Sequence, residues 1–366
     1  MLPLAIAAPP PVALTARLPA AVTVAAPFTV RFRAAGKPVV VASGPAMASF
    51  TARRTGPGRY AATVRLARAG RWTIAVRAGG RHYRLGAVTV RLPAPKTVFF
   101  AQPASIAAAP DGTLVLAEAA ANRIVRVTTA GVVTPIATGV ANPYGVAVAP
   151  SGDVYATTSD TLVRIDASGR VTPVFTVADL GPVTVAADGG VYVSTSTDVF
   201  RIDPATGGSV HVAGTGVRGG AGDGGPAASA QINHPHALLV AADGALLVPD
   251  TDNHRLRRID PLTHVITTIA SGIAGISGIC AGGGATYLTD FTGMTVLRLE
   301  AAGATVIAGN GVKASSGDGR EATQASLDTP LSCAVAGGAV YVVEGGGTGT
   351  IRVVHPGGTI ATLAHR

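Results

Sequence analysis

The sequence predicts an all-β protein in which a small β-sandwich precedes a six-bladed β-propeller. Glycine is abundant (47 of 366 residues) and hydrophobic residues make up 48%, whereas aromatic residues make up only 4%, which is typical of short strands joined by tight turns. No segment shows a helical period, and no apolar run is long enough to cross a membrane. Finally, a unit of about forty residues recurs from residue 103 to residue 366, as expected for a propeller.

The repeating unit is clearest between His211 and Ala270. Apolar runs at 236–241, 246–249, 255–260 and 265–270 are separated by Gly, Asp and Asn turns, which predicts four antiparallel strands. When the other units are aligned on the Asp-Gly turn, six residues share the first position of the unit: Ala104, Tyr144, Gly181, His236, Ile276 and Pro330. The intervals are 40, 37, 55, 40 and 54 residues, and both long intervals contain Gly-Asp-Gly, at 222–224 and 317–319.

This unit resembles an NHL repeat. The resemblance rests on the Gly222–Pro226 loop, the turn at 243–244, and a segment made of Asp250, Asn253, Arg255 and Leu256. It implies a six-bladed propeller of NHL type over residues 97–366. Similar propellers include streptogramin lyases, gluconolactonase-like hydrolases and amidating lyases, so the resemblance leaves both a binding protein and an enzyme open.

The N-terminal part alternates apolar and polar residues. Runs at 28–33, 60–66 and 72–77 predict strands with one buried face, and about seven such strands over 12–92 predict an immunoglobulin-like sandwich with Trp72 in its core. The segments at 57–60 and 69–76 resemble small bacterial Ig-like domains of the YtkA-like kind. Residues 1–11 are a candidate signal-peptide remnant, residues 93–96 a proline-rich linker, and residues 97–101 one further strand.

Charge divides the chain in two. Residues 1–95 contain fourteen basic and no acidic residues, whereas residues 96–366 contain the other fifteen of the 29 basic residues and all twenty acidic ones. Because Arg31, Arg33, Arg65 and Arg77 share the polar parity of their strands, we expect one arginine-rich sandwich face. That face could be simply solvated, bind an anionic cell-envelope polymer or lipid headgroups, or dock on the acidic propeller. Nucleic acid is not expected, because no exposed aromatic pairs are available for base stacking.

The loops that enter each blade and the loops between its second and third strands should share one face of the propeller. This places Tyr144, His234, His236, Asp250, Asp290 and Glu344 at the mouth of the central tunnel, where we expect ligand binding. The position of Asp250 is filled in the six units by Glu118, Thr158, Thr195, Asp250, Asp290 and Glu344. Four carboxylates in a ring suggest a cation site, but their recurrence favours turn capping through backbone N–H groups.

Two histidines flank the entry to one inner strand. His234 and His236 point the same way on a strand and could contribute to a Zn²⁺ site, the metal that resemblance to amidating lyases implies. The other five units offer no histidine there, so we predict no cofactor, with a divalent cation (Zn²⁺ or Ca²⁺) as the alternative. His211, His254 and His264 are expected at the surface. The Gly-Asp-Gly loops lack the Lys-Ser/Thr of a phosphate loop, and one Asp supplies too few oxygens for Ca²⁺.

Cys280 and Cys333 lie on the predicted first strands of the last two units. The two residues are one aligned position apart, and neighbouring first strands could approach closely enough for a bond if the side chains converge. We expect buried free thiols, with a disulfide as the alternative.

Taken together, these features predict a monomeric, non-catalytic protein of the extracellular space or cell envelope. Its propeller would bind a protein or carbohydrate, with the basic sandwich as spacer or polyanion anchor. The alternative is a metal-dependent lyase or lactonase-type hydrolase with its site at the tunnel mouth.

Overall fold

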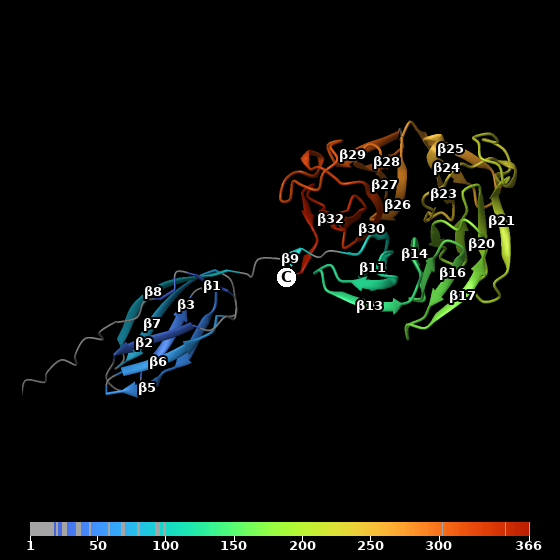
Figure 1. Ribbon diagram of the computed structural model, residues 1–366. Coiled ribbons are helices and arrows are strands. Elements are labelled where there is room, and N and C mark those ends of the chain that lie inside the picture. The colour runs from blue at the N-terminus through green and yellow to red at the C-terminus, as the bar shows by residue number, and fades with distance from the viewer. Residues whose placement is uncertain are drawn as a thin grey trace, which may run out of the picture. The chain divides into compact units, whose positions relative to one another are not determined.

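The computed structural model describes residues 18–19, 21–23, 28–33, 38–43, 45–57, 59–66, 70–78, 81–91, 96–97, 100–301, 303–347 and 349–365. The chain forms two compact units, residues 1–95 and 96–366 (Figure 1). The candidate signal-peptide remnant (1–11) and linker residues 93–95 lie outside the described residues. The described part contains no α-helix, and none of its helical segments could span a membrane.

The first unit is a sandwich of two sheets around one core. The five-stranded sheet has the order β1 (Ala21–Thr23), β8 (Arg81–Arg91), β7 (Gly70–Ala78), β3 (Val39–Ser43) and β4 (Met47–Thr51). The three-stranded sheet has the order β2 (Phe28–Arg33), β6 (Arg59–Val64) and β5 (Arg53–Gly56). Alternate residues of β2 and β7 face inward, so Phe32 and Trp72 join a single apolar core. Trp72 is only 2% exposed, which confirms its predicted core position.

The four arginines predicted to share a face do not all do so. Arg31 and Arg33 point outward from β2, and exposed Arg65 follows β6 of the same three-stranded sheet. Arg77 points outward from β7 and therefore lies on the five-stranded sheet. The expectation of one arginine-rich face therefore holds for Arg31, Arg33 and Arg65 but is wrong for Arg77, because alternation along a strand separates inside from outside but does not say to which sheet the strand belongs.

The described residues of the second unit form six four-stranded antiparallel sheets, each with its strands in chain order. The first three sheets are β10 (Pro103–Ala108), β11 (Leu114–Glu118), β12 (Arg123–Val127), β13 (Val133–Thr138); β14 (Gly145–Val148), β15 (Val154–Thr157), β16 (Thr161–Ile165), β17 (Val171–Thr176); and β18 (Val183–Val185), β19 (Val191–Ser194), β20 (Asp198–Ile202), β21 (Ser209–Gly214). The last three are β22 (Leu239–Val240), β23 (Leu246–Asp250), β24 (Arg255–Ile259), β25 (Ile266–Ser271); β26 (Ile276–Gly282), β27 (Ala285–Asp290), β28 (Thr295–Glu300), β29 (Gly303–Ala308); and β30 (Pro330–Ala336), β31 (Ala339–Glu344), β32 (Ile351–Val354), β33 (Ile360–Thr362).

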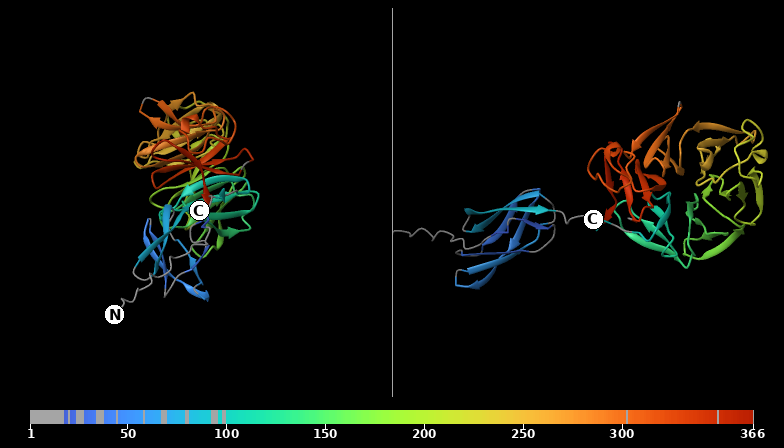
Figure 2. Two further views of the ribbon diagram at one scale, coloured as in Figure 1. Left: turned by 90° about the vertical axis from the view of Figure 1, so that its left-hand side faces the viewer. Right: turned by 45° about the horizontal axis from the view of Figure 1, so that its top comes forward.

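These sheets close into a ring, which is the architecture of a β-propeller (Figure 2). Each first strand packs against the first strands of both neighbouring sheets, and β30 packs against β10. The ends of this unit also meet, because β9 (Lys96–Thr97) pairs with β34 (Ala364–His365). Of the strand predicted at 97–101, residues 98–99 lie outside the described residues; Thr97 lies in a strand, and Phe100 is buried in the core.

The four strands predicted around His236 form, with one difference. The second, third and fourth strands match β23, β24 and β25 within one residue at each end. The first was predicted at 236–241, but the ladder of β22 contains only Leu239 and Val240. The segment from His234 to Leu238 therefore runs outside the sheet hydrogen bonding, at the entrance of the ring.

Side-chain hydroxyls join every pair of neighbouring sheets. The first strand of each sheet is an edge strand, so backbone groups on its free side need other partners. A serine or threonine of the preceding sheet supplies one, at 2.7–3.5 Å, in the pairs Ser105–Val146 N, Thr157–Gly181 O, Ser194–Pro235 O, Thr251–Ile276 O, Ser277–Pro330 O and Ser332–Ile106 N. These hydrogen bonds hold neighbouring sheets together although no backbone β-ladder connects them.

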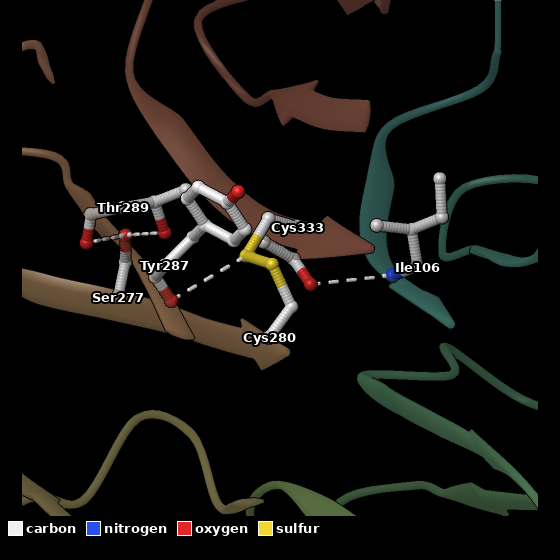
Figure 3. Close-up of a disulfide and its surroundings, with 7 residues drawn as sticks. Ile106, Ser277, Cys280, Tyr287, Thr289 and Cys333 are labelled. Carbon is white, nitrogen blue, oxygen red and sulfur yellow. Dashed lines mark hydrogen bonds between the residues drawn. A yellow bond between two sulfur atoms is a disulfide. The ribbon is translucent and has the colours of Figure 1, made fainter. Parts of the chain in front are cut away.

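A disulfide joins Cys280 of β26 to Cys333 of β30, so the expectation of free thiols is wrong (Figure 3). Their Cα atoms are 5.7 Å apart. Glycines permit this approach: a Cβ at Gly278 would lie 2.8 Å from the Cα of Ser332, and one at Gly282 would lie 2.6 Å from Val335. At this junction the two first strands are staggered by one residue, so the residue aligned with Cys280 is not the one that faces it. The repeat alignment does not show this stagger.

Candidate functional site

The first strands of the six sheets enclose a cavity of about 280 Å³ on the ring axis. Its wall is built mainly from Ala, Gly, Ser and Val, and every sheet contributes. At the end where these strands begin, Tyr144 and His236 line the cavity. The small wall residues leave the cavity open, so the larger side chains at this end determine what can enter it from this side.

Three ring systems gather on one side of this mouth. The ring of His236 lies 6.2 Å from that of His234 and 6.3 Å from that of Phe291, to which it is nearly parallel (10°). Phe291 follows β27, and its amide N–H donates to the carbonyl of Gly275 at 2.9 Å. A Cβ at Gly275 would lie 2.9 Å from the Phe291 ring, so this glycine leaves room for the ring.

Phe291 was missed in the sequence analysis. It occupies the position directly after the repeat acid, where the other five units have small residues: Ala119, Ser159, Ser196, Thr251 and Gly345. A single large apolar side chain at an exposed turn of an otherwise regular repeat was the signal that could have identified it.

The polar groups of the mouth are a histidine held by a carboxylate and two neutral groups, His236 and Tyr144. Nδ1 of His234 lies 2.7 Å from a carboxylate oxygen of Asp252, and the His234 amide N–H donates to Ser196 O of the third sheet. Burial, followed by the proximity of His234, lowers the pKa of His236, so its imidazole is neutral near pH 7. Tyr144 is 43% exposed, and burial of its hydroxyl raises its pKa, which keeps the phenol protonated. His236 and Tyr144 can therefore both donate and accept hydrogen bonds.

The recurring carboxylates accept hydrogen bonds from backbone amides, either of the loop that enters their sheet or of their own turn. Asp250 and Glu344 are fully buried and accept from the amides of Asn233 (2.8 Å) and Asp328 (2.9 Å), in the loops that enter those sheets. Glu118 accepts in the same way from the amide of Ala101, at 2.8 Å. Asp290 accepts from two amides of its own turn, those of residues 292 and 293. Because these carboxylates have internal partners, we do not include them in the ligand-binding surface proposed below.

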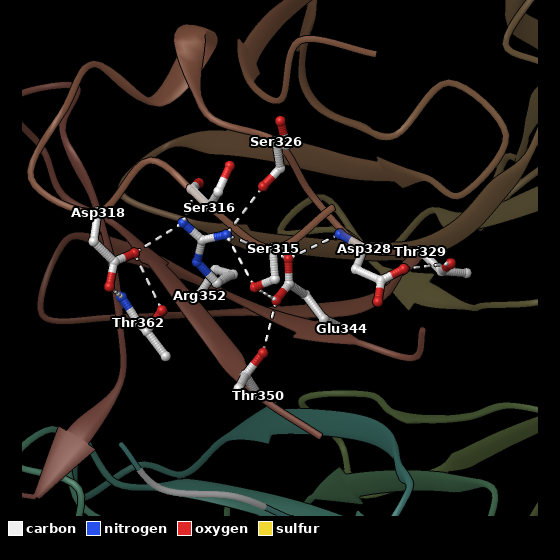
Figure 4. Close-up of polar contacts among 10 residues, drawn as sticks. All are labelled: Ser315, Ser316, Asp318, Ser326, Asp328, Thr329, Glu344, Thr350, Arg352 and Thr362. Carbon is white, nitrogen blue, oxygen red and sulfur yellow. Dashed lines mark hydrogen bonds and ion pairs between the residues drawn. The ribbon is translucent and has the colours of Figure 1, made fainter. Parts of the chain in front are cut away.

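The Gly-Asp-Gly insertions are held by buried arginines. Arg352, with no exposed surface, reaches Asp318 Oδ1 at 3.0 Å and Glu344 Oε1 at 3.4 Å (Figure 4). Asp318 also accepts from the amide and hydroxyl of Thr362. The other insertion repeats this arrangement with Arg257, Asp223, Asp250 and Thr268.

The two arginines were also missed in the sequence analysis. The equivalent residues in the other four sheets are Val125, Val163, Phe200 and Leu297, so arginine occurs only in the two sheets preceded by an insertion. The joint occurrence of Asp in the insertion with Arg and Thr in the sheet was the available signal. The insertions are thus anchored parts of the fold.

The described residues do not bring together a set of metal ligands. Among the described residues, no group of three or more His, Cys, Asp or Glu side chains is arranged to hold a metal ion. The carboxylates of Asp250 and Glu344 are bound by amides and by arginine. His211, on the outer strand β21, contacts Asp198, and His254 contacts the carbonyl of Ala274. Both are exposed, as is His264, which agrees with their predicted surface positions.

The fold and the mouth define a two-unit all-β protein with a β-propeller whose ring encloses an aromatic-rimmed cavity. No protein-family model matches the sequence, and no curated protein matches it. Among solved structures, it is similar to a Bacteroides thetaiotaomicron protein of unknown function (16% identity, 96% of this chain and 98% of that chain, TM-score 0.57) and to an auxiliary nutrient binding protein from the same organism (12%, 96% and 98%, TM-score 0.55).

It is also similar to an inactive variant of virginiamycin B lyase from Staphylococcus aureus with quinupristin (16% identity, 74% of this chain and 88% of that chain, TM-score 0.52). At such low identity these likenesses show the fold alone. The solved structures with this fold thus include both a binding protein and an enzyme.

Proposed function

We propose that this chain is a non-catalytic binding protein that takes a carbohydrate at the mouth of the propeller, on the surface formed by Tyr144, His236 and Phe291. The observation that carries the proposal is the combination of ring faces with neutral hydrogen-bonding groups at the entrance of an axial cavity. Aromatic faces stack on the apolar face of a sugar ring, while a phenol and a neutral imidazole bond to its hydroxyls. A protein ligand is the alternative occupant.

The size of the cavity suits the terminal sugar of an oligosaccharide. Sites for drug-sized ligands usually measure about 300–1,000 Å³, and the cavity here measures about 280 Å³. One sugar unit could enter while the remainder contacts the rim. The fold shared with the auxiliary nutrient binding protein is consistent with this proposal.

We also infer that the propeller sheets are NHL-type repeats (97–366) and that residues 12–92 form an Ig-like domain. An extracellular or envelope location is supported by the Cys280–Cys333 disulfide, because such bonds persist in oxidising compartments. Metal-dependent lyase or hydrolase activity has no comparable support, since the described residues at the mouth do not present a metal-ligand set.

The test is binding of the full chain to an array of bacterial and plant glycans, followed by affinity measurement on the best glycan. Tyr144→Ala and Phe291→Ala should each weaken binding about tenfold through loss of stacking. Phe175→Ala is the matched control, because it removes a half-buried ring from the outer strand β17. The proposal fails if no glycan binds, or if the control variant loses as much affinity as the mouth variants.

A further inference from the structure

The outer face of the three-stranded sheet in the first unit is dominated by arginine. We define the arginine face by the exposed residues Arg31, Arg33, Arg53, Arg59 and Arg65. The register places Arg33 of β2 directly opposite Arg59 of β6. Arg31 and Arg53 lie on either side of Ala61 in the next row. Five positive side chains thus cover a sheet of only three strands.

This charge has no carboxylate to balance it within the unit. Residues 1–95 contain no Asp or Glu, and no ion pair among the described residues involves an arginine of this unit. In the propeller the pattern is the reverse: exposed arginines such as Arg126 and Arg164 pair with Asp111 and Asp153 of the adjacent turn. Like charges directly opposite on neighbouring strands repel each other, so the arginine face opposes folding unless an anion binds it.

The spacing of the arginines suits a repeating anion. Alternate residues of a strand are about 7 Å apart and opposite residues of paired strands about 5 Å apart. The face therefore offers guanidinium groups in rows. A guanidinium binds a phosphate or carboxylate through two parallel hydrogen bonds, which a lysine ammonium cannot do. Thr29 and Thr63, opposite each other on the same face, add hydroxyl groups.

Other anionic partners fit this face less well. Tyr60, the one aromatic residue of β6, packs against Phe32 of the core with ring centroids 6.1 Å apart, so it is not positioned to stack on a base. A membrane surface would favour exposed apolar side chains beside the basic ones. Within the described residues of this unit, the large exposed apolar residue is Met47, which lies on β4 of the other sheet.

We propose that the arginine face binds a linear anionic polymer with a phosphate or carboxylate in each repeat. The site lies in the first unit and does not depend on the carbohydrate site of the propeller. It would attach the chain to a polyanionic surface while the propeller binds its own ligand.

The test measures binding of the full chain to inorganic polyphosphate and to polygalacturonate, across a range of salt concentrations. The first variant is Arg31→Gln/Arg33→Gln/Arg59→Gln. The control is Arg71→Gln/Arg77→Gln/Arg84→Gln, which removes the same charge from exposed positions of the five-stranded sheet. Fluorescence of Trp72, the single tryptophan, shows whether the sandwich core is intact in each variant.

We expect at least one polymer to bind, with affinity that falls as salt rises. The first variant should bind about 10- to 100-fold more weakly. The slope of log affinity against log salt concentration should become shallower by about three, one for each arginine removed. The control should change affinity by less than about threefold. If the Gln variant does not fold, the Arg→Lys version should fold and still lose affinity, because lysine keeps the charge but not the bidentate geometry.

Three results would overturn the proposal. Equal losses in both variants would mean that only net charge matters. Binding of neither polymer would remove the ligand class. Tighter binding to oligothymidylate, or to phosphatidylglycerol vesicles, than to both polymers would assign the face to single-stranded nucleic acid or to a membrane.

Discussion

Removal of the Cys280–Cys333 disulfide should destabilise the propeller without changing the sandwich. The bond links residues 53 apart in sequence, and loop-closure entropy for that separation corresponds to about 4 kcal/mol at 25 °C. For a unit of this size, such a loss should lower the melting temperature by roughly 10 °C. The ring should still close, because Ser277 continues to bond to Pro330 O across the same junction at 2.7 Å.

The assay compares the wild type, the wild type with reductant, and Cys280→Ala/Cys333→Ala. Thermal unfolding is followed by far-ultraviolet circular dichroism and, in parallel, by Trp72 fluorescence. Because Trp72 is buried in the sandwich core, its transition reports on the first unit. The propeller transition should shift equally in the reduced wild type and in the double variant, and reductant should not shift the double variant further.

Two outcomes would refute this reasoning. A shift of the propeller transition below about 2 °C would mean that the ring does not depend on closure of this loop. An equal shift of the Trp72 transition would mean that the effect is not confined to the unit that contains the disulfide.

Two further predictions concern charge. Arg352→Met leaves buried Glu344 without its cation and should lower the free energy of unfolding by about 3–5 kcal/mol in urea denaturation. The control Arg126→Met breaks an exposed ion pair and should lower it by less than about 1 kcal/mol. Equal losses in the two variants would contradict the anchoring role of Arg352. The folded pKa of His236 is below the usual 6.5, so between these two pKa values the unfolded chain binds more protons than the folded chain. The free energy of unfolding should therefore be level above pH 6.5 and decrease as the pH falls from 6.5 toward the folded pKa. NMR titration would measure that pKa, and His236→Gln should abolish this part of the pH dependence.

Much of the fold was predictable because its determinants are local. Alternation of side chains and Gly/Asp/Asn turns specify each strand, and recurrence of the unit specifies the number of sheets. The strands predicted at 246–249 and 255–260 accordingly match β23 and β24 closely. Amide binding by the recurring acid was foreseeable in kind: Asp290 accepts from amides of its own turn, whereas Asp250 accepts from the amide of Asn233 in the entering loop.

The mouth was predictable only in part. Topology placed Tyr144 and His236 at one end of the ring, and both line the cavity there. The contact of His236 with Phe291 joins residues of two different sheets, and burial of the acids depends on how each entering loop folds back. These relations arise between repeats, so comparison of aligned positions does not reveal them.

The sequence alone therefore determined the all-β class, the six repeating sheets and the separation of a basic part from an acidic one, because periodicity, turn chemistry and charge can all be counted along a chain. Tertiary structure decided which sheet displays each arginine, whether the two cysteines meet and which ring contacts His236. The stagger of neighbouring sheets and the assignment of strands to sheets depend on packing between distant segments, and no local pattern encodes them.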